Sequence, residues 1–148
     1  DIKTMQDIYT AREALEGMAA RLAARHMSDE DILSLQSLLD SHEQAISASD
    51  GKAYLQEEGN IDFHHRIANA SQNQWILENL NGELYQLIRM CRYKSGQQPT
   101  RPAKALAQHR QIAMAIEQRD EELAELLMRR HISGAWKIVK KILELQHD

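Results

Sequence analysis

The sequence predicts an all-α fold, an antiparallel bundle of six or seven helices, and three observations support this prediction. Apolar residues recur at spacings of three and four, whereas no stretch shows the alternating pattern of a half-buried strand. Proline, which interrupts helices, occurs only at Pro99 and Pro102. Aromatic residues make up only 5% of the chain, and this scarcity favours helices over a β-sandwich.

The first two predicted helices are separated by a helix start signal. The first helix spans about residues 5–27, where apolar positions follow a period of 3.6 residues. It ends before Ser28-Asp29-Glu30-Asp31, which combines an N-cap residue with acidic residues for a first turn. The second helix spans about residues 29–48 and stops at Ser49-Asp50-Gly51, a turn-forming sequence.

Four further helices follow along the chain. The third covers about residues 52–70, and Ser71-Gln72-Asn73 separates it from the fourth, at about 74–94. The longest loop then spans 95–102 and is rich in Gly, Gln and Pro. We expect the fifth helix at about 103–119 and the sixth at about 121–145.

Size, charge and cysteine content limit what the chain can do. Its 148 residues suffice for one domain with a single substantial core. A net charge of −4 gives no electrostatic reason to bind nucleic acid, so any DNA contact should come from outside this segment. Cys91 is the only cysteine, and no run of residues is long and apolar enough to cross a membrane. We therefore expect a cytoplasmic protein with no membrane partner.

Three histidines occupy positions that a helical core normally gives to apolar side chains. His64, His109 and His131 lie on three different predicted helices, each at the middle of an apolar stripe. Any one of them could be an ordinary core histidine bonded to the backbone. Three together would leave several imidazole nitrogens unsatisfied, at roughly 1–3 kcal/mol each, unless they share a cation. The pattern predicts a metal site, with a packing role as the alternative.

Asn60 is the candidate fourth ligand. It lies one helical turn before His64 on the same face, so its amide oxygen and the imidazole could reach one ion. Asp62 and His65 form a competing pair, but they fall on the opposite, solvent-facing side of the helix. Three nitrogen ligands favour Zn²⁺, Ni²⁺ or a neighbour in that series over Mg²⁺ or Ca²⁺.

Arg12 lies on the apolar face of the first helix, where an unpaired guanidinium would be costly. It could pair with Glu16 one turn along, or extend to the surface. It could instead bind the carboxylate of a small ligand, for which its planar guanidinium is well shaped. Tyr85 and Arg89, an i, i+4 pair on the fourth helix, could line the same pocket or face solvent or a second subunit.

Several motifs together match a known pattern. The segment from Arg12 to Ala20 follows the order Arg-x-x-Leu-Glu-x-x-Ala-Ala. It is followed by Asn60-Ile61-Asp62-Phe63-His64, by Ala70-Ser71-Gln72-Asn73 and by the spaced pair His109 and His131. In these features, and over essentially its full length, the chain resembles the FCD effector-binding domain of the FadR branch of the GntR family of bacterial transcription regulators.

The resemblance implies a metal site and a ligand. Family members typically bind a divalent transition metal through an Asp and a His one turn apart plus two later histidines, and here those positions are Asn60, His64, His109 and His131. The family most often has Asp where this chain has Asn60, and a neutral amide ligand would weaken metal binding. It would also leave the +2 charge of the ion uncompensated. With Arg12 nearby, this favours an anionic effector, such as one with more than one carboxylate.

Taken together, the resemblance implies that residues 1–148 are an FCD-like effector-binding and dimerisation domain and not an enzyme. A small carboxylate metabolite would bind the metal and control DNA binding by a homodimer. Family members carry a winged helix-turn-helix ahead of this domain, so we expect Asp1 to follow such a part, removed or separately folded. The alternatives are a helical metalloenzyme with an open three-His metal site, for hydrolysis or oxygen chemistry, and a simple helical interaction module.

Overall fold

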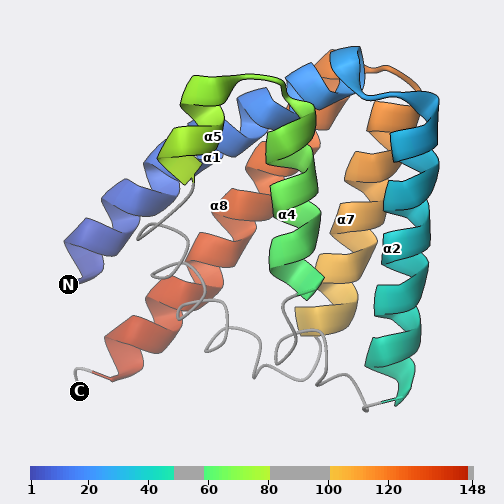
Figure 1. Cartoon of the computed structure of the whole chain (residues 1–148). Coiled ribbons are helices and arrows are strands. Elements are labelled where there is room, and N and C mark those ends of the chain that lie inside the picture. Colours follow the sequence, from blue (N-terminus) through green and yellow to red (C-terminus); the bar gives the residue numbers. More distant parts are fainter. Residues whose placement is uncertain (49–58, 81–100, 147–148) are drawn as a thin grey trace.

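The structure is a computed structural model that describes residues 1–48, 59–80 and 101–146 (Figure 1). Within these ranges it contains six α-helices and no strand, which confirms the all-α prediction. The helices are α1 (Ile2–His26), α2 (Asp29–Ala48), α4 (Gly59–Ala70), α5 (Gln74–Leu80), α7 (Arg101–Glu117) and α8 (Glu121–Leu145).

The helices form a bundle around one shared interior (Figure 1). The two long helices α1 and α8 run in opposite directions and share the most extensive helix–helix contact among the described elements. Helix α2 packs against α7, again with opposite direction. Helix α4 packs on α1 and α2, and its inward side chains reach residues of α7 and α8. Four helices thus surround the positions of the three predicted histidines.

Polar residues fix where several helices begin. Asp1, Ser28, Asn73 and Asp120 each accept a hydrogen bond from a backbone N–H in the first turn of the helix that follows, at 3.0–3.1 Å. Such caps satisfy N–H groups that have no partner inside the helix. The start signal at Ser28 and the break at residues 71–73 are therefore confirmed.

Some helix boundaries differ from the prediction. Helix α1 begins at Ile2 instead of residue 5, because Asp1 caps it. Helix α7 begins two residues early, so Pro102 is helical, and in a first turn its missing N–H costs no hydrogen bond. Helix α7 also ends early, at Glu117, and Arg119 takes a left-handed φ of 58°. The predicted helical residues 52–58 and 81–94, and most of the predicted loop 95–102, lie outside the described residues.

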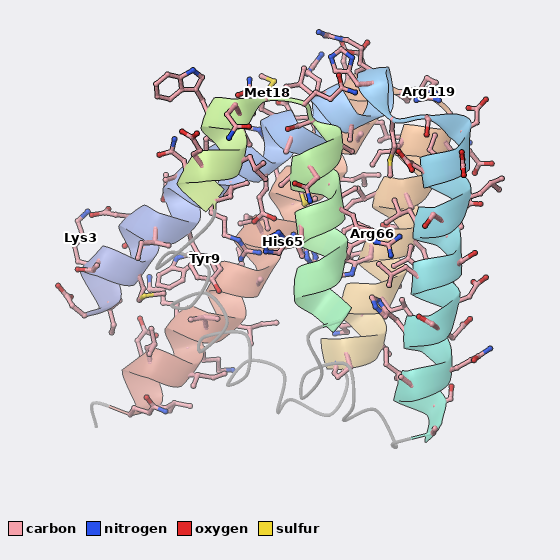
Figure 2. The ribbon with its side chains drawn as sticks, viewed as in Figure 1. Lys3, Tyr9, Met18, His65, Arg66 and Arg119 are labelled. Atoms are coloured by element: carbon pink, nitrogen blue, oxygen red, sulfur yellow. The ribbon has the colours of Figure 1, made fainter. Side chains whose placement is uncertain are left out.

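Arg119 lies in the connection between α7 and α8 and contacts both the end of α1 and the start of α2 (Figure 2). Its guanidinium donates hydrogen bonds to the carbonyl oxygens of Ala24, at 3.2 Å, and of Met27. The same group pairs with the carboxylate of Asp29 at 2.9 Å. The Arg119 cation therefore binds carbonyl oxygens at the C-terminal end of α1 and an acidic side chain of α2. The first contact is favourable because the last carbonyls of a helix have no partner inside it and carry a negative partial charge, and the second is an ion pair.

The core is built from the apolar stripes that the sequence predicted. Each large apolar side chain that is fully buried in this core, such as Leu, Ile, Phe or Met, contributes about 1.5–3 kcal/mol to folding because it leaves water. Within the part of the chain described, no helix is both long and apolar enough to span a lipid bilayer. The three helices that carry the predicted histidines also supply these buried apolar residues to the core: Phe63, Ile67, Ala68, Leu106, Ile112, Ile116, Met128, Ile132 and Ala135.

Candidate metal centre

The three predicted histidines meet in the core. His64 lies on α4, His109 on α7 and His131 on α8, and their exposed fractions are 1%, 0% and 4%. Each one projects from the middle of a buried face, as the helical period predicted. Their imidazole rings are mutual neighbours, with centroids 4.7–5.3 Å apart. Side chains from three distant parts of the sequence are therefore brought into one cluster.

The nitrogens of the cluster have the spacing of ligands to one ion. The Nε2 atom of His131 lies 3.1 Å from Nε2 of His109 and 3.3 Å from Nε2 of His64. One nitrogen from each ring can be chosen so that all lie within 4.8 Å of one another. Nitrogens bound to one tetrahedral Zn²⁺ at about 2.0–2.1 Å are about 3.3–3.4 Å apart. The donor set and its dimensions thus fit a first-row divalent transition ion.

Glu16 supports the cluster from α1, and sequence reasoning missed this contact. Its Oε1 atom lies 2.5 Å from Nδ1 of His64, and the carboxylate is 1% exposed. Burial alone would raise the pKa of Glu16, but the charge of Arg12, the charge of His64 when its ring is protonated, and the hydrogen bonds with both residues outweigh burial and lower the pKa to about 2. Glu16 is therefore an ionised carboxylate in the core, directly behind one candidate ligand.

The other two rings are also held by neighbours. The Nδ1 atom of His131 lies 2.6 Å from the amide oxygen of Gln108 on α7. The ring of Phe63 stacks on the ring of His109, with centroids 4.0 Å apart and an interplanar angle of 13°. Metal-binding histidines are commonly oriented by such outer contacts, because a ring with a fixed orientation needs no reordering to bind the ion.

Arg12 pairs with Glu16, which was one of its possible partners. The Nε atom of Arg12 contacts Oε2 of Glu16, and the Arg12 side chain is 1% exposed, which excludes the alternative of a side chain extended to the surface. The guanidinium also lies 5.3 Å from the centre of the Tyr9 ring, which extends from α1 toward α8 (Figure 2). The two η nitrogens of Arg12 are buried and have no hydrogen-bond partner among the described residues. A buried guanidinium with two unpaired η nitrogens is suited to bind an anion, because the anion would accept hydrogen bonds from both nitrogens.

The remaining candidates cannot be placed as side chains. Asn60 belongs to helix α4, but its side chain, like that of Asp62, is outside the described residues. Tyr85 and Arg89 fall within 81–100, also outside the described residues. His65, on the competing face of α4, is half-buried and is not part of the three-histidine cluster. Of the four predicted metal ligands, the structure therefore brings His64, His109 and His131 together, whereas the side chain of Asn60 lies outside the described residues.

The fold and sequence are similar to those of known regulators. Residues 7–134 match the FCD domain family. The chain is 26% identical over 143 residues to an uncharacterized HTH-type transcriptional regulator YdhC of Bacillus subtilis (strain 168), a match that covers 96% of this chain and 62% of that protein. It is 27% identical over 147 residues to the Nta operon transcriptional regulator of Aminobacter aminovorans, covering 98% and 64%. The chain thus spans less than two thirds of the length of these relatives.

Two solved structures share the architecture. A Streptococcus agalactiae GntR structure superposes with a TM-score of 0.66 at 25% identity, covering 88% of this chain and 57% of the other. The E. coli McbR/YncC structure superposes with a TM-score of 0.72 at 22% identity, covering 99% and 66%. The second likeness is one of fold alone. In both cases part of the other chain has no counterpart here.

Proposed function

Because this chain belongs to the FCD domain family, we propose that it is the ligand-sensing, dimerising domain of a GntR/FadR-type transcription regulator. The relatives that it matches along almost its whole length are named as transcriptional regulators. They are longer than this chain, and we infer that a DNA-binding part accompanies it in the full-length regulator. A homodimer would then set the separation of two DNA half-sites.

The observation that carries the proposal is the convergence of three buried Nε2 atoms. His64, His109 and His131 would hold a divalent ion, with Zn²⁺ or Ni²⁺ favoured by three imidazole ligands. Asn60, one turn before His64 on α4, is the candidate for a further ligand. A metal bound by three protein nitrogens keeps positions open, and when bound it supplies a Lewis acid to which a carboxylate can bind.

The charges around the cluster favour an anionic effector. Three neutral imidazoles leave the +2 charge of the ion unbalanced, and the negative charge of Glu16 is matched by Arg12. Glu16 touches both Arg12 and His64, so only one carboxylate separates the guanidinium from the histidine cluster. The free η nitrogens of Arg12 could clamp one end of an effector whose carboxylate binds the metal. We infer a small carboxylate metabolite, with Tyr85 and Arg89 as further candidates for its contacts.

Control of DNA binding requires that the effector favour one arrangement of the helices. An effector changes a conformational equilibrium only by the difference between its affinities for the two states. Here the candidate ligands come from α4, α7 and α8, and Arg12 comes from α1. An effector that contacts the metal and Arg12 together would therefore stabilise one relative placement of four helices. That placement would be transmitted to the dimer and its DNA-binding parts.

The metalloenzyme alternative finds less support. Hydrolysis at an open metal position needs a general base whose pKa lies near the working pH. Glu16 is the carboxylate that contacts the cluster among the described residues, and Arg12 and His64 lower its pKa to about 2. The named functions of the matched relatives are regulatory. We therefore infer a binding protein and not an enzyme.

A combined metal analysis and thermal-shift experiment tests the proposal. The chain is purified without added metal, treated with a chelator, and melted with and without Zn²⁺ or Ni²⁺ and with a panel of central-metabolism carboxylic acids. We expect one ion per chain, a rise in melting temperature with metal, and a further rise with at least one carboxylate, without turnover of that acid. A protein that binds no divalent metal, or that consumes the acid, would contradict the proposal.

A further inference from the structure

A metal ligand must present a lone pair, so the proton of a neutral imidazole has to be on the other ring nitrogen. For His64 the nitrogen facing the cluster is Nε2. Its Nδ1 atom lies 2.5 Å from Oε1 of Glu16. The other oxygen of Glu16 pairs with the Arg12 guanidinium, and a carboxylate in an ion pair only accepts hydrogen bonds, so Nδ1 of His64 is the donor. The neutral His64 ring then directs the lone pair of Nε2 into the cluster.

The same argument applies to His131 with a different partner. Its Nδ1 atom lies 2.6 Å from the amide oxygen of Gln108, which also accepts a hydrogen bond. Nδ1 of His131 therefore carries the proton, and Nε2 is again a lone pair. Both partners are oxygen acceptors, although they differ in charge and come from different helices, α1 and α7.

These two assignments leave two acceptors facing each other. The Nε2 atoms of His64 and His131 are 3.3 Å apart, and with both Nδ1 atoms protonated neither Nε2 of the neutral rings can donate. Two lone pairs at this distance repel one another, and these two rings cannot hydrogen-bond to each other. A cation at the cluster turns that repulsion into two bonds. The arrangement of outer contacts is therefore the one that a metal requires.

Stability alone does not explain why the Arg12–Glu16 ion pair is buried in the core. Both side chains are 1% exposed. A buried ion pair contributes little to stability compared with apolar side chains of similar volume, because both charges lose water. A function for the charges is consistent with their position. The Oε2 atom of Glu16 meets Arg12, and Oε1 meets His64.

We propose that Glu16 and Gln108 are positioning residues that fix the tautomers of His64 and His131, so that both Nε2 lone pairs point at one metal ion. The inference rests on the metal site proposed above and adds two residues to it. Arg12 acts through Glu16 by holding the carboxylate in place. Such outer-shell residues typically change metal affinity by about 10- to 100-fold when they are removed.

The test measures Co²⁺ binding, because the visible absorption of this ion reports both affinity and coordination geometry. The variants are Glu16→Gln, Glu16→Ala, Gln108→Ala and Gln108→Glu. Matched controls are Glu13→Gln and Gln111→Ala, which alter partly or fully exposed residues of the same two helices. We expect about 10- to 100-fold weaker Co²⁺ binding and altered absorption for the two alanine variants. Gln108→Glu should restore tight binding, because it retains an acceptor, and the controls should match the wild type.

A second readout uses the metal-free protein. Histidine ring ¹⁵N shifts identify which nitrogen carries the proton, and we expect protonated Nδ1 on His64 and His131 of the wild type. Gln108→Ala should release His131 from that tautomer while circular dichroism remains unchanged. If the Glu16 variants fail to fold with Arg12 unpaired, the double variant Arg12→Met/Glu16→Gln removes both charges, and the Gln108 variants test the second half of the proposal independently.

The outcomes separate this inference from the proposed function. Tight Co²⁺ binding by the wild type with equal affinity in all folded Glu16 and Gln108 variants would overturn the positioning role and leave the metal site intact. A wild-type protein that binds no Co²⁺, Zn²⁺ or Ni²⁺ would overturn both. Protonation of Nε2 on His64 or His131 in the metal-free protein would also contradict the inference, whatever the metal affinity.

Discussion

The ring of Phe63 lies flat against the ring of His109, with 4.0 Å between centroids and 13° between planes. Phe63 immediately precedes His64 on α4, and it is fully buried. Two consecutive residues of one helix thus serve the cluster in different ways. His64 offers a nitrogen, while Phe63 limits how the imidazole of α7 can turn.

Replacement of Phe63 by Leu should therefore affect both stability and the metal. We expect a loss of about 1–3 kcal/mol in the free energy of unfolding, because Leu fills the space incompletely. Metal affinity should fall only several-fold, because His109 keeps its place on α7. Urea unfolding and Zn²⁺ titration measure the two effects. Ile112→Val, a milder change in the same core, is the control, and it should leave affinity unchanged. Equal metal affinity in Phe63→Leu would argue against a role for the stacked ring.

His109→Ala should abolish metal binding. His109 contributes one of the three converging nitrogens, and its Nε2 atom is 3.1 Å from that of His131. Without it two histidines remain, and the metal-dependent rise in melting temperature should disappear while helicity measured by circular dichroism persists. His65→Ala, a change at a half-buried residue outside the cluster, is the control and should keep the metal. Stoichiometric metal in His109→Ala would contradict the assignment.

Arg12 and Glu16 should be strongly coupled in a double-mutant cycle. Arg12→Met alone leaves a carboxylate in the core with His64 as its remaining contact among the described residues, and removal of one member of a buried pair typically costs about 3–5 kcal/mol. The double variant Arg12→Met/Glu16→Gln should be less destabilised than the sum of the single variants, with a coupling of about 0.5–3 kcal/mol. Thermal and urea unfolding of the four proteins gives this value. Additive effects would show that the pair does not act as a unit.

Much of this site could be predicted from the sequence. The helical period places His64, His109 and His131 on buried faces, and the structure confirms all three positions. Periodicity cannot report which helices meet, so it could not show that Glu16 contacts His64, a residue 48 positions away. A signal was present nonetheless. Glu16 shares the buried face of α1 with Arg12, and a carboxylate in such a place needs more than one partner.

The fold was predicted well except at helix ends. Caps such as Ser28 and Asp120 are local, so the sequence marks them directly. The end of α7 depends instead on Arg119, an arginine in a left-handed conformation where glycine would be expected. Its contacts with Ala24, Met27 and Asp29 stabilise that conformation. These partners are distant in the sequence, and no local pattern identifies them.

Arg119→Ala should destabilise the bundle without changing the metal site. The variant loses hydrogen bonds to two carbonyl oxygens of the α1 end and the ion pair with Asp29. We expect a loss of about 1–3 kcal/mol in the free energy of unfolding, with unchanged Zn²⁺ affinity. Arg119→Gly removes the same contacts but tolerates φ of 58°, so it should be less destabilised than Arg119→Ala. The reverse order in thermal melts would show that backbone strain at this position is unimportant.

Glu125 should stabilise the α1–α8 contact in a pH-dependent way. Its carboxylate accepts a hydrogen bond from Arg21 at 2.8 Å, and this bond, with the charge of Arg21 and the hydrogen bond and charge of Arg129, lowers the pKa of Glu125 from its ordinary value despite partial desolvation. Because the folded-state pKa is lower than the unfolded one, the contribution is complete above about pH 4.5 and is lost as the pH falls through the folded-state value.

Glu125→Gln should therefore lower the melting temperature slightly at pH 7, by an amount that corresponds to at most about 1 kcal/mol. The difference from the wild type should shrink below pH 4 and in high salt, and Glu122→Gln, on an exposed face of α8, should show neither effect. A Glu125→Gln effect that is independent of pH and salt would mean that packing, not charge, joins the helices there.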